Sequence, residues 1–308
     1  MRRTLAVVFA LAVAALPGRA ALARGDEPPA EHHHPVEVPV ATSSASASRQ
    51  IEAVAREHRH DAPTPSPAAQ AAPRRGVSIM EGFAYAKLGK EGKPVMGYAA
   101  AALGPEPPKA AILVIHEWWG VNDNIQSMVR RLAGEGYSAL AVDLYEGQTA
   151  ADPAHATALM QASLKDPDRL IDNLRQARAW LDGQFHPAKV GVIGWCYGGG
   201  WSLRTALALP DRIDAAVVYY GQPIADPKEL GKLKAPLLGH FGELDQAFKI
   251  PDVRAMETQL QKLGKNATIY LYPGADHAFA NPSGGRYNEA AAQEAWQRTV
   301  AFLQKYLN

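Results

Sequence analysis

The sequence predicts a doubly wound α/β domain over residues 77–308, in which a mostly parallel sheet is flanked by helices. Short β-rich runs alternate there with segments whose apolar residues recur near the helical period of about 3.6 residues. The run at 110–115 is apolar throughout, which is typical of a strand buried on both faces. This alternation of strand and helix favours right-handed crossovers within one parallel sheet, whose ligands gather at the carboxyl ends of the strands.

The expected elements follow one another along the chain. After the strand at 110–115, we expect strands at 138–142, 190–193, 215–220, 236–241 and 268–272. Helices are expected at 125–133, 154–164, 167–181, 199–209, 251–263 and 287–307, where the apolar residues have helical spacing. Asp166 before Pro167 favours a helix start, and Gly264 is placed as a glycine that ends a helix.

The N-terminal segment has the pattern of an export signal. Arg2 and Arg3 precede an apolar run at 5–16 that is too short to span a bilayer comfortably. A small-x-small pattern at 21–23 completes a signal peptide over 1–23, so we expect a periplasmic or secreted protein. An uncleaved anchor is the alternative. No later stretch is apolar enough for a transmembrane helix, so no stable membrane span is expected after signal removal.

Residues 24–76 are rich in Ala, Pro, Ser and His and poor in large apolar side chains. Such a composition buries too little surface to offset the entropy of ordering, so we expect a disordered linker. The run at 32–34, with His58 and His60, offers imidazoles to a metal ion. Neither cysteine nor carboxylate partners stand at ligand spacing, so a solvated linker without metal is the prediction.

The overall composition argues against nucleic acid as a partner. The chain has 32 Lys and Arg against 31 Asp and Glu, with no extended basic block, and a small or neutral substrate is the better expectation. Cys196 is the single cysteine, so no internal disulfide can form. A lone thiol is either an inert buried side chain or a reactive group, and its sequence context decides between them.

That context is a strand that turns at once into a helix. The strand expected at 189–194 meets Trp195, Cys196 and Tyr197, and a glycine-rich helix start follows. In a nucleophile elbow the central residue is strained and crowds the positions two before and two after it, which here are Gly194 and Gly198. The pattern indicates an α/β-hydrolase fold with Cys196 as nucleophile, its thiolate favoured by the helix N-terminus.

A nucleotide-binding loop is the rival interpretation of this glycine-rich turn. The glycines lack the G-x-G-x-x-G spacing, and no Gly-Lys-Ser/Thr follows, so the elbow is favoured. In this fold the acid and the histidine follow the nucleophile in chain order, on loops after later strands. Asp245 and His277 stand at such positions and complete a predicted catalytic triad.

Rivals exist for both roles. Glu243 and Asp252 are nearby carboxylates, and Asp276 adjoins the histidine but is expected to point away from its ring. His116 and His240 have a weaker case as the base.

The oxyanion formed on attack needs two backbone donors. We expect them to be the N–H groups of Tyr197, directly after the nucleophile, and Trp118, after an earlier strand. Glu117, at the end of that strand, either bonds the resting thiol or pairs elsewhere. The pair His116-Glu117 is no zinc motif, because the second histidine of H-E-x-x-H would fall at Gly120.

The chain resembles the dienelactone hydrolases, or carboxymethylenebutenolidases, over nearly all of 77–308. The similar stretches are Ile112 to Asn122 with Glu117, Val142 to Tyr145, the cysteine elbow, Tyr219 to Gly221, Asp245, and His277 to Phe279. The resemblance implies a Cys196, His277, Asp245 triad that needs no cofactor or metal. It further implies that Glu117 pairs with the thiol until substrate displaces it.

One departure from the family pattern concerns the substrate. The position four after the histidine, an arginine in archetypal family members, is Asn281, and a second expected arginine has no clear equivalent at 154–164. Dienelactone itself is therefore not the expected substrate, although Arg286 or His155 are candidate replacements for these cations. Aromatic and polar residues are expected to line the pocket: Trp118, Trp119, Trp195, Tyr197, Phe279 and Asn281.

The function predicted from the sequence is hydrolysis of a small ester or lactone through an acyl-cysteine intermediate. A non-catalytic binding module on the same scaffold is the alternative. A thiol redox protein is disfavoured, because no second cysteine forms a Cys-x-x-Cys pair.

Overall fold

The structure is a computed structural model, and it describes residues 44–59, 61 and 72–308. The predicted signal peptide lies outside the described residues, as do the histidines at 32–34 and 60. Within the described part, no helix has the length and apolar character needed to cross a membrane.

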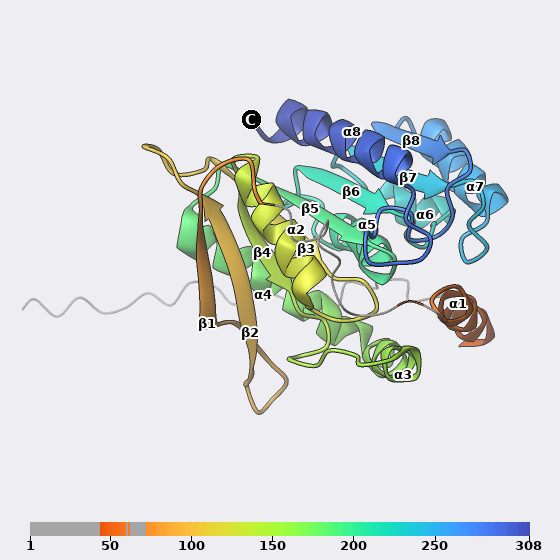
Figure 1. The fold of residues 1–308 in the computed structure, drawn as a ribbon, viewed down its shortest axis with the longest axis horizontal. Coiled ribbons are helices and arrows are strands. Elements are labelled where there is room, and N and C mark those ends of the chain that lie inside the picture. The colour runs from red at the N-terminus through yellow and green to blue at the C-terminus, as the bar shows by residue number, and fades with distance from the viewer. Residues whose placement is uncertain (1–43, 60, 62–71) are drawn as a thin grey trace, which may run out of the picture. The chain divides into compact units, whose positions relative to one another are not determined.

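An eight-stranded sheet forms the centre of the described domain (Figure 1). Its strands are β1 (Val77–Leu88), β2 (Lys93–Ala102), β3 (Ala110–Ile115), β4 (Ser138–Val142), β5 (Lys189–Trp195), β6 (Ala215–Tyr219), β7 (Leu237–Gly242) and β8 (Ala267–Tyr272). They lie in the order β1-β2-β4-β3-β5-β6-β7-β8. Strand β2 pairs antiparallel with β1 and with β4, and every pair from β4 to β8 is parallel. The predicted mostly parallel sheet is confirmed, and the antiparallel edge of β1 and β2 adds to the predicted strands.

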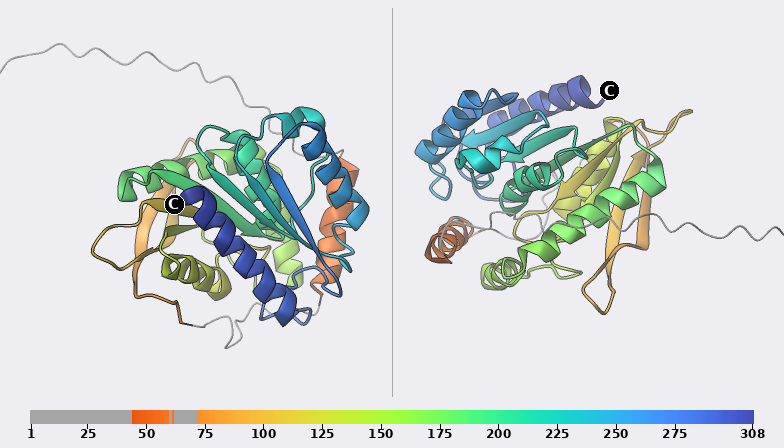
Figure 2. Two further views of the ribbon diagram at one scale, coloured as in Figure 1. Left: turned by 90° about the horizontal axis from the view of Figure 1, so that it is seen from above. Right: turned by 180° about the vertical axis from the view of Figure 1, so that it is seen from behind.

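Helices cover both faces of the sheet (Figures 1 and 2). Helices α2 (Asp123–Gly134) and α8 (Glu289–Leu307) lie on one face, and α4 (Pro167–Phe185) and α5 (Tyr197–Ala208) lie on the other. The domain also contains α3 (Pro153–Ser163), α6 (Pro227–Gly231) and α7 (Ile250–Lys262). The predicted helix ends are confirmed: Asp166 accepts a hydrogen bond from the Arg169 N–H at 3.0 Å, and Gly264 follows α7 with a φ of 61°.

The central strands are buried from end to end. Every residue of β3 and β4 is buried, and in β5 only the first residue is partly exposed. Helices on both faces exclude water from these strands, which explains their continuous apolar sequences. The register then aligns their carboxyl ends, where Ile115 of β3 lies opposite Gly194 of β5. The segments that follow β3, β5, β7 and β8 therefore meet at one edge of the sheet.

Residues 44–57 correct the prediction of a disordered linker. They form helix α1 (Ser44–Glu57), which contacts α3 (Figure 1). Ile51 and Val54 are buried, and with His58 they recur at the spacing of one helical face. The composition is too polar for a core of its own, but one apolar stripe is enough when a folded domain supplies the opposite surface. Residues 24–43, 60 and 62–71 of the predicted linker lie outside the described residues.

Candidate active site

Cys196 occupies the sharp turn between β5 and α5. Its backbone adopts a φ of 53° and a ψ of −117°, a conformation that costs a non-glycine residue roughly 1–3 kcal/mol. The glycines on either side permit the turn: a Cβ on Gly194 would clash with the carbonyl oxygen of Gly198, and one on Gly198 would clash with the carbonyl oxygens of Ile115 and His116. The crowding that the sequence predicts at these two glycines is confirmed.

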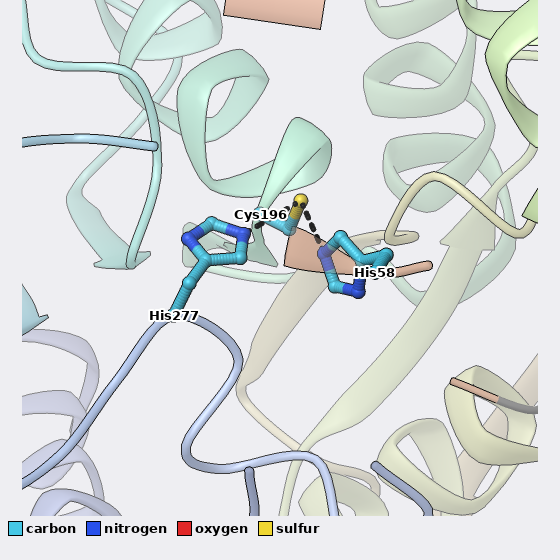
Figure 3. A group of neighbouring side chains, drawn as sticks. All are labelled: His58, Cys196 and His277. Atoms are coloured by element: carbon cyan, nitrogen blue, oxygen red, sulfur yellow. Dashed lines mark hydrogen bonds between the residues drawn. The ribbon is translucent and has the colours of Figure 1, made fainter. Parts of the chain in front are cut away.

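The side chains of Cys196, His277 and Asp245 form a continuous chain of contacts. The Nε2 atom of His277 lies 3.2 Å from Sγ of Cys196 (Figure 3), and its Nδ1 atom lies 2.8 Å from Oδ2 of Asp245. All three residues are buried. The loop after β7 supplies Asp245, and the loop after β8 supplies His277, so two neighbouring parallel strands bring them together.

Backbone groups hold the aspartate in place. Oδ1 of Asp245 accepts hydrogen bonds from the N–H groups of Ala247 and Phe248, both at 2.8 Å, which leaves Oδ2 for the imidazole.

The rival residues have other positions. Glu243 and Asp252 are exposed, and Asp276 accepts a hydrogen bond from the backbone N–H of His277 at 2.6 Å. The imidazole of His116 accepts from the Leu144 N–H, and that of His240 contacts Tyr272 and Thr299.

The surroundings of the thiol favour its ionised form. Burial alone would raise the pKa of Cys196, but the charge and hydrogen bond of His277, with the nearby His58, lower it to about 6. Burial acts to lower the pKa of His277, yet the Asp245 carboxylate and the Cys196 thiolate raise it well above its usual value. The lowered pKa of Cys196 and the raised pKa of His277 both favour a thiolate next to an imidazolium. This ion pair is the reactive state of a cysteine nucleophile.

Glu117 is buried near the thiol, but its hydrogen bonds go elsewhere. Its Oε2 accepts from the Asn281 side-chain nitrogen at 2.8 Å, and its Oε1 accepts from the Tyr220 hydroxyl at 3.5 Å. Burial, together with the charge of Cys196, raises the pKa of Glu117 to about 7. Within the described residues no hydrogen bond joins Glu117 to the thiol, so the predicted thiol partnership is not what the structure shows.

An unpredicted residue, His58, lies against the thiol instead. Its Nε2 atom is 3.6 Å from Sγ of Cys196, on the other side from His277 (Figure 3), and its ring is 4.8 Å from that of Trp118. Its Nδ1 atom lies 2.6 Å from Oδ2 of Asp61. The sequence carries a signal for this pair, since the histidine and the aspartate stand three residues apart just after an amphipathic helix.

Arg286 fixes this N-terminal segment to the domain. Its guanidinium contacts Glu57 at 3.6 Å and Asp61 at 3.1 Å, and Nη2 is also 3.1 Å from Nδ1 of His58. A guanidinium can only donate, and Nδ1 of His58 donates to Asp61, so Arg286 bonds the two carboxylates and, through Nε, the backbone oxygen of His277 at 2.9 Å. The structure thus gives Arg286 a role other than the predicted replacement for a substrate-binding arginine, and His155, the other candidate, is exposed on α3.

The predicted oxyanion donors lie at the same edge of the sheet. Tyr197 begins α5 directly after Cys196, and Trp118 follows the neighbouring β3. Across the described residues, the backbone N–H groups of these two residues have no hydrogen-bond partner. Two amides are therefore free to donate to an oxygen.

A cavity of about 420 Å³ borders part of this cluster. Glu117, Trp195, Tyr220 and Asn281 line it together with residues of α2 and α8. Trp119 and Phe279, which the sequence places in a pocket, do not line it. They are buried among other aromatic rings, and the Phe279 ring lies 5.0 Å from that of Tyr272, so their place in a substrate pocket stays a prediction.

Trp118 and Tyr197 also lie away from the cavity wall, and Cys196 exposes no surface to it. Glu117, whose pKa is raised by the nearby charge of Cys196, is a lining residue of the cavity.

Comparison with known proteins places this geometry in context. The family model described as "Dienelactone hydrolase family" matches residues 96–307. "Protein usf" of Aquifex pyrophilus is 34% identical over 225 residues, which cover 71% of this chain and 96% of that protein. A Saccharolobus solfataricus protein provisionally named carboxymethylenebutenolidase is 32% identical over 240 residues, covering 65% of this chain and 91% of its own. A crystal structure from Klebsiella pneumoniae, provisionally named dienelactone hydrolase, superposes with a TM-score of 0.67 at 27% identity, covering 75% of this chain and 100% of that one.

Proposed function

This chain belongs to the dienelactone hydrolase family and is a carboxylic ester hydrolase, and from that premise we propose that it cleaves a small ester or lactone with Cys196 as nucleophile. One observation carries the proposal: the unbroken contact chain from Sγ of Cys196 through His277 to Asp245, with separations of 3.2 and 2.8 Å. The same order of nucleophile, base and carboxylate performs acyl transfer on several unrelated folds.

The first half of the reaction forms a thioester. The Cys196 thiolate attacks the carbonyl carbon, and the backbone N–H groups of Tyr197 and Trp118 donate to the oxyanion. The tetrahedral intermediate collapses by breaking the carbon–oxygen bond, and the His277 imidazolium gives its proton to the departing alkoxide. In a lactone that alkoxide stays tethered to the acyl group. Asp245 holds the Nδ1–H tautomer of His277 and stabilises its charged form.

The second half regenerates the thiolate. Neutral His277 takes a proton from water, and the resulting hydroxide attacks the thioester carbonyl. Breaking the carbon–sulfur bond releases the carboxylic acid and returns Cys196 to its thiolate form beside the imidazolium.

The polar group that stands at the position of the family's arginine, Asn281, favours neutral substrates. The side-chain nitrogen of Asn281 donates to Glu117, and its oxygen accepts from Asn124 at 3.3 Å and from the Ser283 N–H at 2.9 Å. This amide is already engaged and carries no charge, so it offers little to a substrate carboxylate. We therefore expect small neutral esters and lactones to be better substrates than dienelactone, which carries a carboxylate.

The decisive experiment is a panel of aryl esters and enol-lactones, including dienelactone, on the full chain and on Cys196→Ala. We expect hydrolysis of neutral substrates by the native protein, and a loss of kcat/KM of at least about 10³-fold in the variant. Circular dichroism establishes that the variant is folded. Equal activity of the two proteins would overturn the role of the thiol, and no hydrolysis by the native protein after treatment with a metal chelator would favour the non-catalytic binding module.

Export is a further part of the proposal. The pattern at 1–23 supports a signal peptide, and the intact mass of the protein recovered from the periplasm or medium tests it. Recovery of uncleaved protein in the cytoplasm would contradict the export proposal.

A further inference from the structure

We propose that His58, Cys196 and His277 form a binding site for Zn²⁺. The site joins the N-terminal segment to the catalytic domain (Figure 3), and hydrolysis uses only one of its two histidines. Binding of the ion does not rest on the proposed function, whereas its effect on hydrolysis does.

The ligand atoms have nearly the spacing that the ion requires. Zn²⁺ binds thiolate sulfur at about 2.3 Å and imidazole nitrogen at about 2.0–2.1 Å, so tetrahedral geometry sets its ligand atoms roughly 3.3–3.6 Å apart. Sγ of Cys196 lies 3.6 Å from Nε2 of His58 and 3.2 Å from Nε2 of His277. The three ligand atoms all lie within 4.8 Å of one another. Only the separation of the two nitrogens has to shrink, and by about 1.5 Å at most.

Both histidines carry the outer partner that metal-binding histidines need. The Nδ1 atom of His58 contacts Asp61 at 2.6 Å, and that of His277 contacts Asp245 at 2.8 Å. A carboxylate at Nδ1 holds the proton there and leaves the Nε2 lone pair for the ion. Hydrolysis explains the pair formed with Asp245. It does not explain a second imidazole and carboxylate aimed at the same sulfur.

The chemistry of the ligands selects the ion. One thiolate and two imidazoles favour Zn²⁺ over Mg²⁺ or Ca²⁺, which prefer oxygen ligands. Three protein ligands also leave one position for water. His58, Cys196 and His277 expose none of their surface, so an ion held among them is shielded from solvent and from competing ligands.

Helix α1 and the contacts of Arg286 hold His58 at the site. Ile51 and Val54 dock α1, and Arg286 clamps the segment after it through Glu57 and Asp61. If the proposed function holds, the zinc-bound thiolate cannot attack a carbonyl. Zinc binding then describes a protected, inactive form, and departure of His58 together with loss of the ion from Cys196 and His277 would release the nucleophile.

Cobalt titration of the full-length protein tests the site directly. Co²⁺ replaces Zn²⁺ in such sites, and a cobalt–thiolate bond gives a near-ultraviolet charge-transfer absorption that histidines alone cannot give. We expect this band to saturate at one equivalent, to vanish in Cys196→Ala, and to be displaced by Zn²⁺. Because the signal needs sulfur, cobalt bound at the histidines of 32–34 does not contribute to it.

Variants assign the ligands. We expect His58→Gln to weaken Zn²⁺ binding by more than about 100-fold, and Asp61→Asn, which removes only the outer partner, to weaken it by about 10–100-fold. The exposed His155→Gln is the matched control and should bind like the native protein. If His58→Gln fails to fold, the nearly isosteric Asp61→Asn still tests whether the pair of His58 and Asp61 contributes to Zn²⁺ binding.

Two results would overturn the site: no charge-transfer band in the native protein, or native affinity in both His58→Gln and Asp61→Asn. Esterase activity without the cobalt–thiolate absorption band would refute the metal site alone. A protein that shows the band without esterase activity after chelation would refute the proposed function alone.

Discussion

At Cys196 the backbone conformation and the chemistry depend on each other. The positive φ points the sulfur away from the strand and toward the loops after β7 and β8, where His277 and Asp245 are held. That conformation persists because Gly194 and Gly198 carry no Cβ to collide with neighbouring carbonyls. The backbone conformation of this one residue therefore requires the absence of side chains at two others.

Adding a methyl group at the elbow should unfold the turn. In Gly198→Ala the new Cβ would meet the carbonyl oxygens of Ile115 and His116, which belong to the rigid centre of the sheet. We expect the free energy of unfolding to fall by about 3 kcal/mol or more in chemical denaturation. Gly183→Ala in α4 is the control, since nothing lies near its Cβ position and alanine favours a helix. Similar stabilities for the two variants would contradict this account of the elbow.

Neutralising the triad carboxylate should slow the reaction without weakening substrate binding. Asp245→Asn keeps the shape of the side chain but turns a donor toward His277, so the imidazole takes the wrong tautomer. We expect kcat to fall by at least about 10²-fold with KM little changed, measured on the best ester of the panel. Glu243→Gln, at the exposed rival carboxylate, should stay within about twofold of the native kcat. A larger effect at Glu243 than at Asp245 would reverse the assignment.

At the scale of elements, helix α1 shows how little apolar surface is needed to dock a segment. Ile51 and Val54 are buried, while Glu52 and Arg56 between and after them are exposed. Each buried aliphatic side chain contributes about 1.5–3 kcal/mol when fully covered. Docking of α1 in turn holds His58 against the thiol, so we expect this packing contact to affect access to Cys196.

Weakening that contact should expose Cys196 without unfolding the domain. In Val54→Ser the docked state loses apolar burial worth about 1.5 kcal/mol, which corresponds to roughly a tenfold larger open population. We expect iodoacetamide to label Cys196 about tenfold faster in this variant, followed by intact mass, while the melting temperature of the domain stays within a few degrees. Glu52→Ala, on the exposed face of α1, should label at the native rate. Unchanged labelling in Val54→Ser would show that α1 does not cover the thiol.

At the scale of the whole molecule, burial of polar groups between sheet and helices sets the response to acid. His240 of β7 exposes no surface and contacts Tyr272 of β8 at 2.8 Å and Thr299 of α8 at 3.0 Å. Burial, helped by the charge of Arg298, lowers the pKa of His240 to about 3. The folded protein therefore keeps this imidazole neutral at pH values where the unfolded chain binds a proton.

The stability of the native protein should consequently fall as the pH drops. An unfolded histidine has a pKa of about 6.5, so the contribution of His240 is complete above that pH and is lost progressively toward pH 3. We expect His240→Gln to remove up to about 1.4 kcal/mol per pH unit from the slope of unfolding free energy against pH. Urea unfolding at several pH values measures this slope, with His155→Gln as the exposed control. Parallel slopes for the native protein and His240→Gln would disprove the contribution of His240 to the pH dependence of stability.

Much of the fold and the arrangement of the candidate site could be predicted from local patterns. The strand at 110–115 is β3 to the residue, and the strand at 138–142 is β4, because burial on both faces leaves an uninterrupted apolar run in the sequence. The two glycines around Cys196 are also a local requirement of one turn. Asp245 and His277 follow from the rule that parallel strands gather their carboxyl ends at one edge of the sheet.

Contacts between distant segments were decided only by the tertiary structure. His58 lies against the thiol, Glu117 bonds to Asn281 and Tyr220, and Phe279 is buried against Tyr220 although it stands two residues after His277 in the sequence. The spacing of apolar residues in a helix or strand shows which of its faces is buried. It carries no information about which distant part of the chain covers that face. A weakly apolar helix such as α1 becomes ordered only because the folded domain offers it a complementary face, and that face exists only once the chain has folded.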